Sequence, residues 1–101
     1  MITVIASIRV NQAQLPLFLE IFKSNLIDVR NESGCIEYYP TIDVDAGLPP
    51  QDLDPNVVTV IEKWNSLEDL RSHLAAPHMQ TYRQKVQGMV DSVTLKVLKE
   101  A

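Results

Sequence analysis

The sequence has little cysteine, little basic charge and no long apolar run, and each shortage narrows the possible functions. Cys35 is the only cysteine, which excludes an internal disulfide and fits a reducing compartment such as the cytoplasm. Lysine and arginine together number 9 against 13 aspartates and glutamates, for a net charge of −4, and they form no basic run. Nucleic acid and anionic membrane surfaces are therefore not expected as partners.

No apolar stretch is long enough to span a bilayer, so membrane insertion is not expected. The first ten residues have the pattern of a strand and lack the basic start and cleavage site of a signal peptide. A length of 101 residues with 46% hydrophobic and 22% charged side chains is typical of one globular domain. We therefore expect a single domain over residues 1–101, located in the cytoplasm.

Four segments show the two-residue alternation of apolar side chains that is typical of β-strands. They span residues 2–10, 35–44, 57–64 and 90–98. Pro40 cannot donate a backbone hydrogen bond, so the second strand is expected at a sheet edge or with a bulge. The apolar face expected for that strand comprises Ile36, Tyr38, Pro40, Ile42 and Val44.

Helical spacing of apolar residues predicts one helix over residues 15–31. Ser66 is the expected N-cap of a second helix, because its hydroxyl can accept a bond from a first-turn amide. Pro77 fits the first turn of a further helical piece, and Gly88 is a plausible left-handed stop. The core-facing side chains expected on these two pieces are Leu67, Leu70, Leu74, Met79, Tyr82 and Val86.

The resulting order, β-α-β-β-α-β, is the split βαβ plan of the ferredoxin-like α+β fold, with an antiparallel sheet. In such a fold the helices cover one face of the sheet. The strands nevertheless carry apolar side chains on both faces, as shown by Val4 beside Ile5 and by Val60 beside Ile61. Because an exposed apolar sheet is unfavourable, we expect a homodimer that packs sheet against sheet.

Several segments resemble the antibiotic biosynthesis monooxygenase (ABM) domain family, most closely its small bacterial members described as probable quinol monooxygenases. The resemblance lies in "MITVIASIRV", "ESGCIEYYPTIDVDAG", "VIEKWNSLEDLRSHLAAPHM" and the closing strand. It implies a dimeric α+β barrel that oxygenates reduced polycyclic aromatics with molecular oxygen and without metal or flavin. The family's heme-degrading members use other residues at the positions of Ser7, His73 and Arg83, so heme degradation is not expected.

His73 is the first candidate for a catalytic base, because an imidazole near its ordinary pKa suits proton transfer at neutral pH. The alternative is a structural histidine that bonds a strand or loop. Glu62 shares an apolar strand face with Val58 and Val60, where a carboxylate needs a partner or a raised pKa. We expect Glu62 to orient or tune His73. The alternative is a buried ion pair, or a hydrogen bond that fixes the dimer or the corner that follows the strand.

Trp64, Tyr38 and Tyr82 are candidate substrate-binding residues that could line a pocket for a flat aromatic molecule. The alternative for each is a core position, which is the more common one for such residues. His78, at the start of a helical piece, is a further substrate-binding candidate, with a capping role as its alternative. A metal site is not expected from the two histidines, because a proline interrupts their spacing and no third ligand is evident.

The predicted function is cofactor-independent monooxygenation of a reduced quinone or related polyphenol. A quinol anion is electron-rich enough to react with triplet oxygen, so the protein need only supply a dry cavity, a base and hydrogen-bond donors. Two alternatives stay open. One is an isomerase of a small carbonyl metabolite, because a branch of the family that isomerises a phosphorylated signalling metabolite shares the two-histidine arrangement. The other is a protein that binds an aromatic ligand without turnover.

Overall fold

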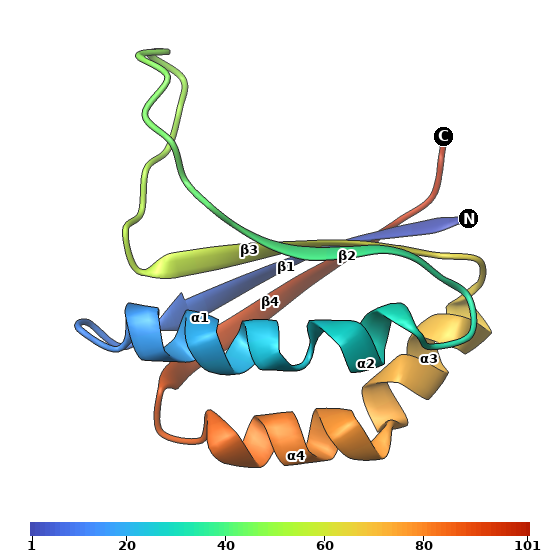
Figure 1. Cartoon of the computed structure of the whole chain (residues 1–101). Coiled ribbons are helices and arrows are strands. Elements are labelled where there is room, and N and C mark those ends of the chain that lie inside the picture. Colours follow the sequence, from blue (N-terminus) through green and yellow to red (C-terminus); the bar gives the residue numbers. More distant parts are fainter.

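The computed structural model describes residues 1–101 and places four helices on one face of a four-stranded antiparallel sheet (Figure 1). The elements are β1 (Ile2–Val10), α1 (Leu15–Ser24), α2 (Leu26–Arg30), β2 (Cys35–Ile42), β3 (Val57–Trp64), α3 (Leu67–Ala75), α4 (Pro77–Lys85) and β4 (Val90–Leu98). The strand order β2-β3-β1-β4 confirms the predicted ferredoxin-like α+β fold. None of the helices is long and apolar enough to cross a membrane.

The core lies between the helices and one face of the two central strands. Ala6 of β1 pairs with Val60 of β3 and with Leu95 of β4, which fixes the register of the sheet. Side chains of β1 and β3 alternate, so every second one faces the helices. The buried strand residues on that face are Val4, Ala6, Ile8, Val10, Val58, Val60, Glu62 and Trp64.

The prediction of a single helix over residues 15–31 is wrong in one respect. The segment is divided at Asn25 into two helices, α1 and α2. Ser24 donates its hydroxyl to the carbonyl of Ile21 at 2.6 Å, a local bond that competes with regular helical bonding. Asn25 contacts the sulfur of Met79 on α4 through its amide nitrogen, 3.4 Å away. Tertiary contact with α4 therefore accompanies the break, which apolar periodicity does not reveal.

The strand β2 is shorter than predicted and contains a bulge. It ends at Ile42, and Cys35 pairs with Trp64 while Glu37 pairs with Lys63, which leaves Ile36 as the extra residue. The predicted inward position of Ile36 is therefore wrong, and its side chain is 46% exposed. The edge position predicted from the proline is confirmed.

The helix α3 begins as predicted, because the Ser66 hydroxyl accepts a bond from the Asp69 amide at 3.1 Å. Its predicted core stripe is only partly right. Leu70 is buried, but Leu67 and Leu74 are exposed, and His73 occupies the inner face in their place. The predicted inward residues of α4 are confirmed, with Met79 and Val86 buried and Tyr82 packed against the core, and Gly88 has the expected positive φ of 85°.

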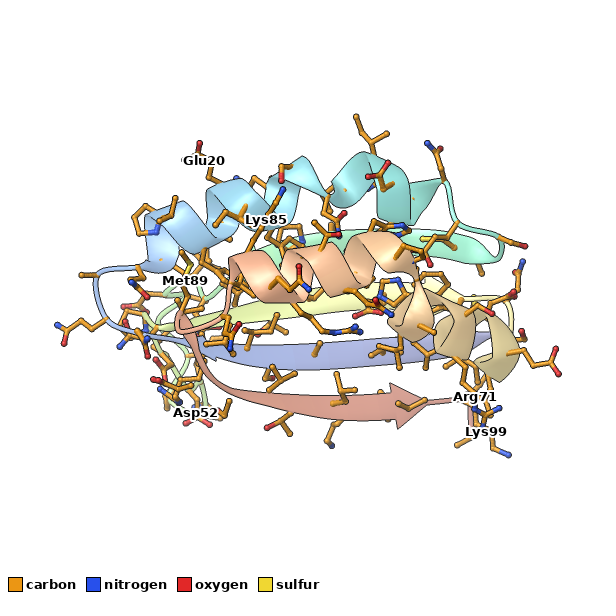
Figure 2. The ribbon with its side chains drawn as sticks, turned by 90° about the horizontal axis from the view of Figure 1, so that it is seen from below. Glu20, Asp52, Arg71, Lys85, Met89 and Lys99 are labelled. Atoms are coloured by element: carbon orange, nitrogen blue, oxygen red, sulfur yellow. The ribbon has the colours of Figure 1, made fainter.

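The second face of the sheet has no helix over it (Figure 1). Ile5 and Ile61 pair across β1 and β3 on that face and are half-buried. On the helix side, the edge strand β4 lies beyond the cover of the helices (Figure 2). Val93, Leu95 and Val97 are consequently exposed, although they pair with buried residues of β1.

Candidate active site

A largely apolar cavity of about 490 Å³ lies between the sheet and the helices. The sheet contributes Ala6, Ile8, Tyr38, Val60, Glu62, Val90, Val93 and Leu95 to its lining. The helices and the turn before β4 contribute Phe22, His73, Leu74, Met79, Tyr82, Arg83, Val86, Gln87 and Gly88. A cavity of this size and composition suits a small, mostly apolar ligand with a few polar groups.

Four of the six candidate site residues meet at this cavity: His73, Glu62, Tyr38 and Tyr82. Trp64 lies behind them and is fully buried, with its ring 4.6 Å from the His73 ring. His78 lines a different, polar hollow between α4 and the segment of α1 and α2. The structure therefore brings His73 together with the two tyrosines at the cavity. Trp64 packs on His73 from behind, and His78 lies outside the cavity.

His73 is held in one orientation by Glu32. Its Nδ1 lies 2.9 Å from Oε2 and 3.2 Å from Oε1 of that carboxylate, and its side chain is only 2% exposed. A carboxylate accepts hydrogen bonds, so Nδ1 carries the proton and Nε2 keeps its lone pair. The ring packs between Trp64 and the edge of Tyr38. The imidazole is thus held in one orientation, with the proton on Nδ1.

Glu32 is the residue at the candidate site that the sequence analysis missed. It lies in the turn between α2 and β2, and its Oε2 is also 2.7 Å from Nε2 of His78. The only available signal was a carboxylate directly before Ser33 and Gly34, inside a segment that resembles the family. Carboxylates are common in turns, so this position alone does not indicate a contact with a helix 41 residues later.

Glu62 is buried as its apolar strand face predicted, but its partner is Trp64. Nε1 of the indole donates to Oε1 of Glu62 at 3.0 Å. Burial raises the pKa of Glu62 to about 7, the charge of Glu32 adds to this rise, and the indole bond opposes it. The role of orienting His73, predicted for Glu62, therefore belongs to Glu32, and Glu62 is a carboxyl group that can stay protonated near neutral pH.

The environment shifts the pKa of His73 in the opposite direction. Burial lowers the pKa of His73, the bond and charge of Glu32 oppose that change, and the positive charges of His78 and Arg83 reinforce it. The cavity therefore contains an imidazole that is neutral at neutral pH beside a carboxyl group that retains a proton. Such oppositely shifted pairs are a common basis for assigning the base and the acid of a site.

Aromatic rings form one wall of the cavity. Phe22 stacks on Tyr38 with ring centres 5.6 Å apart, and Tyr82 meets Phe22 edge-on at 5.7 Å. Burial raises the pKa of both tyrosine hydroxyls, so they stay protonated and can donate hydrogen bonds at any physiological pH. No three histidine, cysteine, aspartate or glutamate side chains are arranged to hold a metal ion.

Residues 1–85 match the antibiotic biosynthesis monooxygenase family. A curated relative from Escherichia coli K12, named probable quinol monooxygenase YgiN, is 36% identical over 97% of this chain and 96% of its own. Among solved structures, a conserved protein from Methanosarcina mazei Go1 superposes with a TM-score of 0.84 at 20% identity, covering 99% of this chain and 92% of that one. Another, titled antibiotic biosynthesis monooxygenase, gives 0.81 at 20% identity, covering 100% and 99%.

The two solved structures establish the fold, and the family match together with the curated relative establishes descent. The chain belongs to the antibiotic biosynthesis monooxygenase family. A monooxygenase role is therefore supported at the level of the family, as the resemblance implied.

Proposed function

We propose that the protein adds one oxygen atom from molecular oxygen to a reduced quinone or related polyphenol, without a metal or organic cofactor. The observation that carries this proposal is His73, a buried neutral imidazole whose Nδ1 is held by Glu32 while the ring lines an apolar, aromatic-walled cavity. A flat, neutral quinol fits such a cavity better than a charged metabolite does.

The reaction begins when Nε2 of His73 takes a proton from a quinol hydroxyl, and the carboxylate of Glu32 stabilises the imidazolium. The quinol anion transfers one electron to oxygen, and the resulting semiquinone and superoxide radicals combine as a ring peroxide anion. His73 returns its proton to the peroxide, which gives the ring hydroperoxide. The O–O bond then breaks, the same ring carbon loses its hydrogen as a proton, and the released hydroxide and proton leave as water. The overall change converts one quinol and one dioxygen into a hydroxylated quinone and water.

Three further groups support the developing negative charge. The protonated carboxyl of Glu62 and the hydroxyls of Tyr38 and Tyr82 line the cavity and can donate hydrogen bonds to substrate oxygens. Trp64 holds the indole bond to Glu62 and packs on the imidazole, so its part is to position both groups. The apolar lining limits the access of water to the anion.

The uncovered sheet face suits a second copy of the chain, and we include a homodimer in the proposal. The apolar pair of Ile5 and Ile61 would be buried there. Sedimentation velocity of wild type and Ile61→Lys tests this, because the charged variant should shift toward monomer. Wild-type monomer at every concentration would contradict it. We place the protein in the cytoplasm, where Cys35 stays reduced.

The isomerase alternative requires cations for a phosphorylated substrate, and the cavity offers one. Arg83 is the only lysine or arginine in its lining, and its guanidinium donates to the carbonyl of Leu74 at 2.6 Å. Arg9 pairs with Asp54, and Lys85 lines the separate polar hollow. The structure therefore favours a neutral aromatic substrate.

The test is oxygen uptake by metal-stripped protein with a reduced naphthoquinol, after subtraction of the autoxidation rate without protein. His73→Asn is the informative variant, because its amide nitrogen can replace Nδ1 in the bond to Glu32 while the cavity-facing nitrogen is lost. We expect its rate to fall by about tenfold or more, within the range for general base catalysis.

Ser72→Ala, an exposed neighbour on α3, is the matched control and should keep the wild-type rate. Uptake no faster than autoxidation, or equal in His73→Asn and wild type, would contradict the proposal. Turnover of a substrate without oxygen would favour the isomerase instead. Ligand binding without any turnover would indicate a binding protein.

A further inference from the structure

His78 has no part in the proposed chemistry, yet it contacts the same carboxylate as the base. It lies at the start of α4, where a polar hollow of about 290 Å³ is bordered by α1, α2 and α4. Its side chain is 26% exposed, and its Nε2 lies 2.7 Å from Oε2 of Glu32. The same oxygen lies 2.9 Å from Nδ1 of His73. Glu32 thus connects a histidine that exchanges protons with solvent to one inside the cavity.

Only the histidines can compensate the charge of Glu32. The carboxylate is 12% exposed, and its only ion-pair partners are His73 and His78. The nearby Arg30 donates its Nε to the carbonyl of Tyr38 at 3.0 Å and does not reach the carboxylate. One negative charge in a poorly solvated position can stabilise one protonated imidazole well. It stabilises two protonated imidazoles less well, because they share the same charge.

We propose that His78 is a positioning residue that sets the proton affinity of His73 through the carboxylate they share. This inference rests on the proposed function, in which His73 is the base. While His78 is neutral, the charge of Glu32 is fully available to stabilise a proton on His73. When His78 takes a proton from solvent, it shares that charge and weakens proton binding at His73. The acidity of the solvent thereby reaches a base that solvent hardly touches.

The two histidines differ in their access to solvent. His73 is nearly inaccessible, and desolvation disfavours its charged form, whereas the side chain of His78 is 26% exposed. A positive charge on His78 lowers the pKa of His73, and Glu32 acts in the opposite direction.

Other charged or titratable groups surround the pair, and none of them bonds Glu32. Around His73 these groups are Cys35 and Tyr38 on β2, Glu62 on β3 and Arg83 on α4. In the hollow beside His78 they are Asp28, Tyr82 and Lys85. Lys85 provides a matched control, because it lines the same hollow without contacting the carboxylate.

The experiment follows both imidazoles by nitrogen-detected NMR titration in wild type, His78→Gln and Lys85→Gln. The glutamine amide can keep the bond to Glu32 but cannot take up a proton. We expect the proton affinity of His73 to be about threefold or more higher in His78→Gln than in wild type. Two unit charges about 6 Å apart give an effect of that size even at the dielectric constant of water. Lys85→Gln should leave the titration of His73 nearly unchanged.

Two further readouts separate this coupling from a purely structural role. In a Glu32→Gln background, adding His78→Gln should change the titration of His73 less than it does in wild type, because only the direct repulsion between the two imidazoles is left. The second readout is the pH dependence of kcat/KM. Its acid limb should lie at lower pH in wild type than in His78→Gln, and the difference should match the difference in the NMR titration of His73. A titration of His73 that is identical in wild type and His78→Gln would overturn the inference. A coupling that is equally strong with and without the Glu32 carboxylate would also overturn it. Because NMR needs no substrate, absence of oxygen uptake would contradict only the proposed function.

Discussion

Oε2 of Glu32 lies 2.9 Å from Nδ1 of His73, although the two residues are 41 positions apart. The contact joins the turn after α2 to the inner face of α3. It depends on how closely that turn approaches α3, and Gly34 determines the approach. The carbonyl of Gly34 accepts a bond from the amide of Asn65 at 2.9 Å, which ties the turn to the corner before α3.

Replacing Gly34 with alanine should destabilise the protein and disturb the bond between Glu32 and His73. Gly34 has a φ of 81°, and a Cβ there would lie 2.1 Å from Oδ2 and 2.7 Å from Cβ of Asp69. The left-handed conformation alone costs about 1–2 kcal/mol for alanine, and displacing Asp69 adds to that cost. Urea unfolding should show a loss of about 2–4 kcal/mol in the free energy of unfolding.

The control for this substitution is Gly88→Ala. Gly88 has a similar φ of 85°, but nothing lies within 4 Å of the position of its Cβ. It should lose only the cost of the conformation, about 1–2 kcal/mol. Equal losses in the two variants would mean that the close approach to Asp69 contributes nothing.

Most of the fold follows from local patterns in the sequence. The strands β1, β3 and β4 begin and end where the alternation predicts. In β1 and β3 the alternation reflects one buried face, whereas in β4 it is present although the strand is largely exposed. The N-cap at Ser66 and the positive φ of Gly88 also follow from the preferences of those residue types. Local chemistry is sufficient at such positions.

The site is less predictable, because its central contact is not local. His73 is more deeply buried than Leu67 and Leu74, in reverse of their hydrophobicity. Its burial is compensated by Glu32, which hydrophobic periodicity on α3 cannot indicate. The position of the bulge at Ile36 could not be predicted either. The proline indicated only that β2 is an edge strand or contains a bulge, and it did not indicate where a bulge would lie.

Glu62→Gln should stabilise the protein at alkaline pH. The pKa of Glu62 is about 7 in the folded protein and about 4.5 as an unperturbed side chain. The folded state therefore holds this proton more strongly, and wild-type stability falls as the pH rises from about 4.5 to about 7. The variant lacks this loss, and its advantage above pH 7 should be on the order of 3 kcal/mol.

Urea unfolding of wild type and Glu62→Gln at several pH values measures this advantage. The low pKa of His73 gives the opposite trend, a loss of stability below its ordinary value, but it affects both proteins and largely cancels in their difference. Glu20→Gln, on the exposed face of α1 (Figure 2), should give no comparable dependence. A difference for Glu62→Gln that does not change with pH would contradict the raised pKa.

Trp64→Phe should raise the pKa of Glu62 further. The indole bond to Oε1 stabilises the ionised carboxylate, and phenylalanine cannot donate a hydrogen bond. Because Trp64 is fully buried, the smaller ring also leaves a void, and we expect a loss of about 1–3 kcal/mol in stability. Carbon-detected NMR titration of the glutamate carboxyl groups measures the pKa directly, and an unchanged or lower value would show that the bond does not matter.

The dependence of kcat/KM on pH should be a narrow bell, because the reaction needs neutral His73 and protonated Glu62. The acid limb should lie below the ordinary histidine pKa, since burial lowers the pKa of His73. The alkaline limb should lie near pH 7, where Glu62 loses its proton.

In Glu62→Gln the amide can still donate a hydrogen bond but cannot ionise, so the alkaline limb should disappear while the acid limb stays in place. Oxygen uptake at each pH, corrected for autoxidation, tests both limbs. An alkaline limb that persists in Glu62→Gln would assign that ionisation to the substrate or to another residue, and would leave Glu62 without the role of neutral donor.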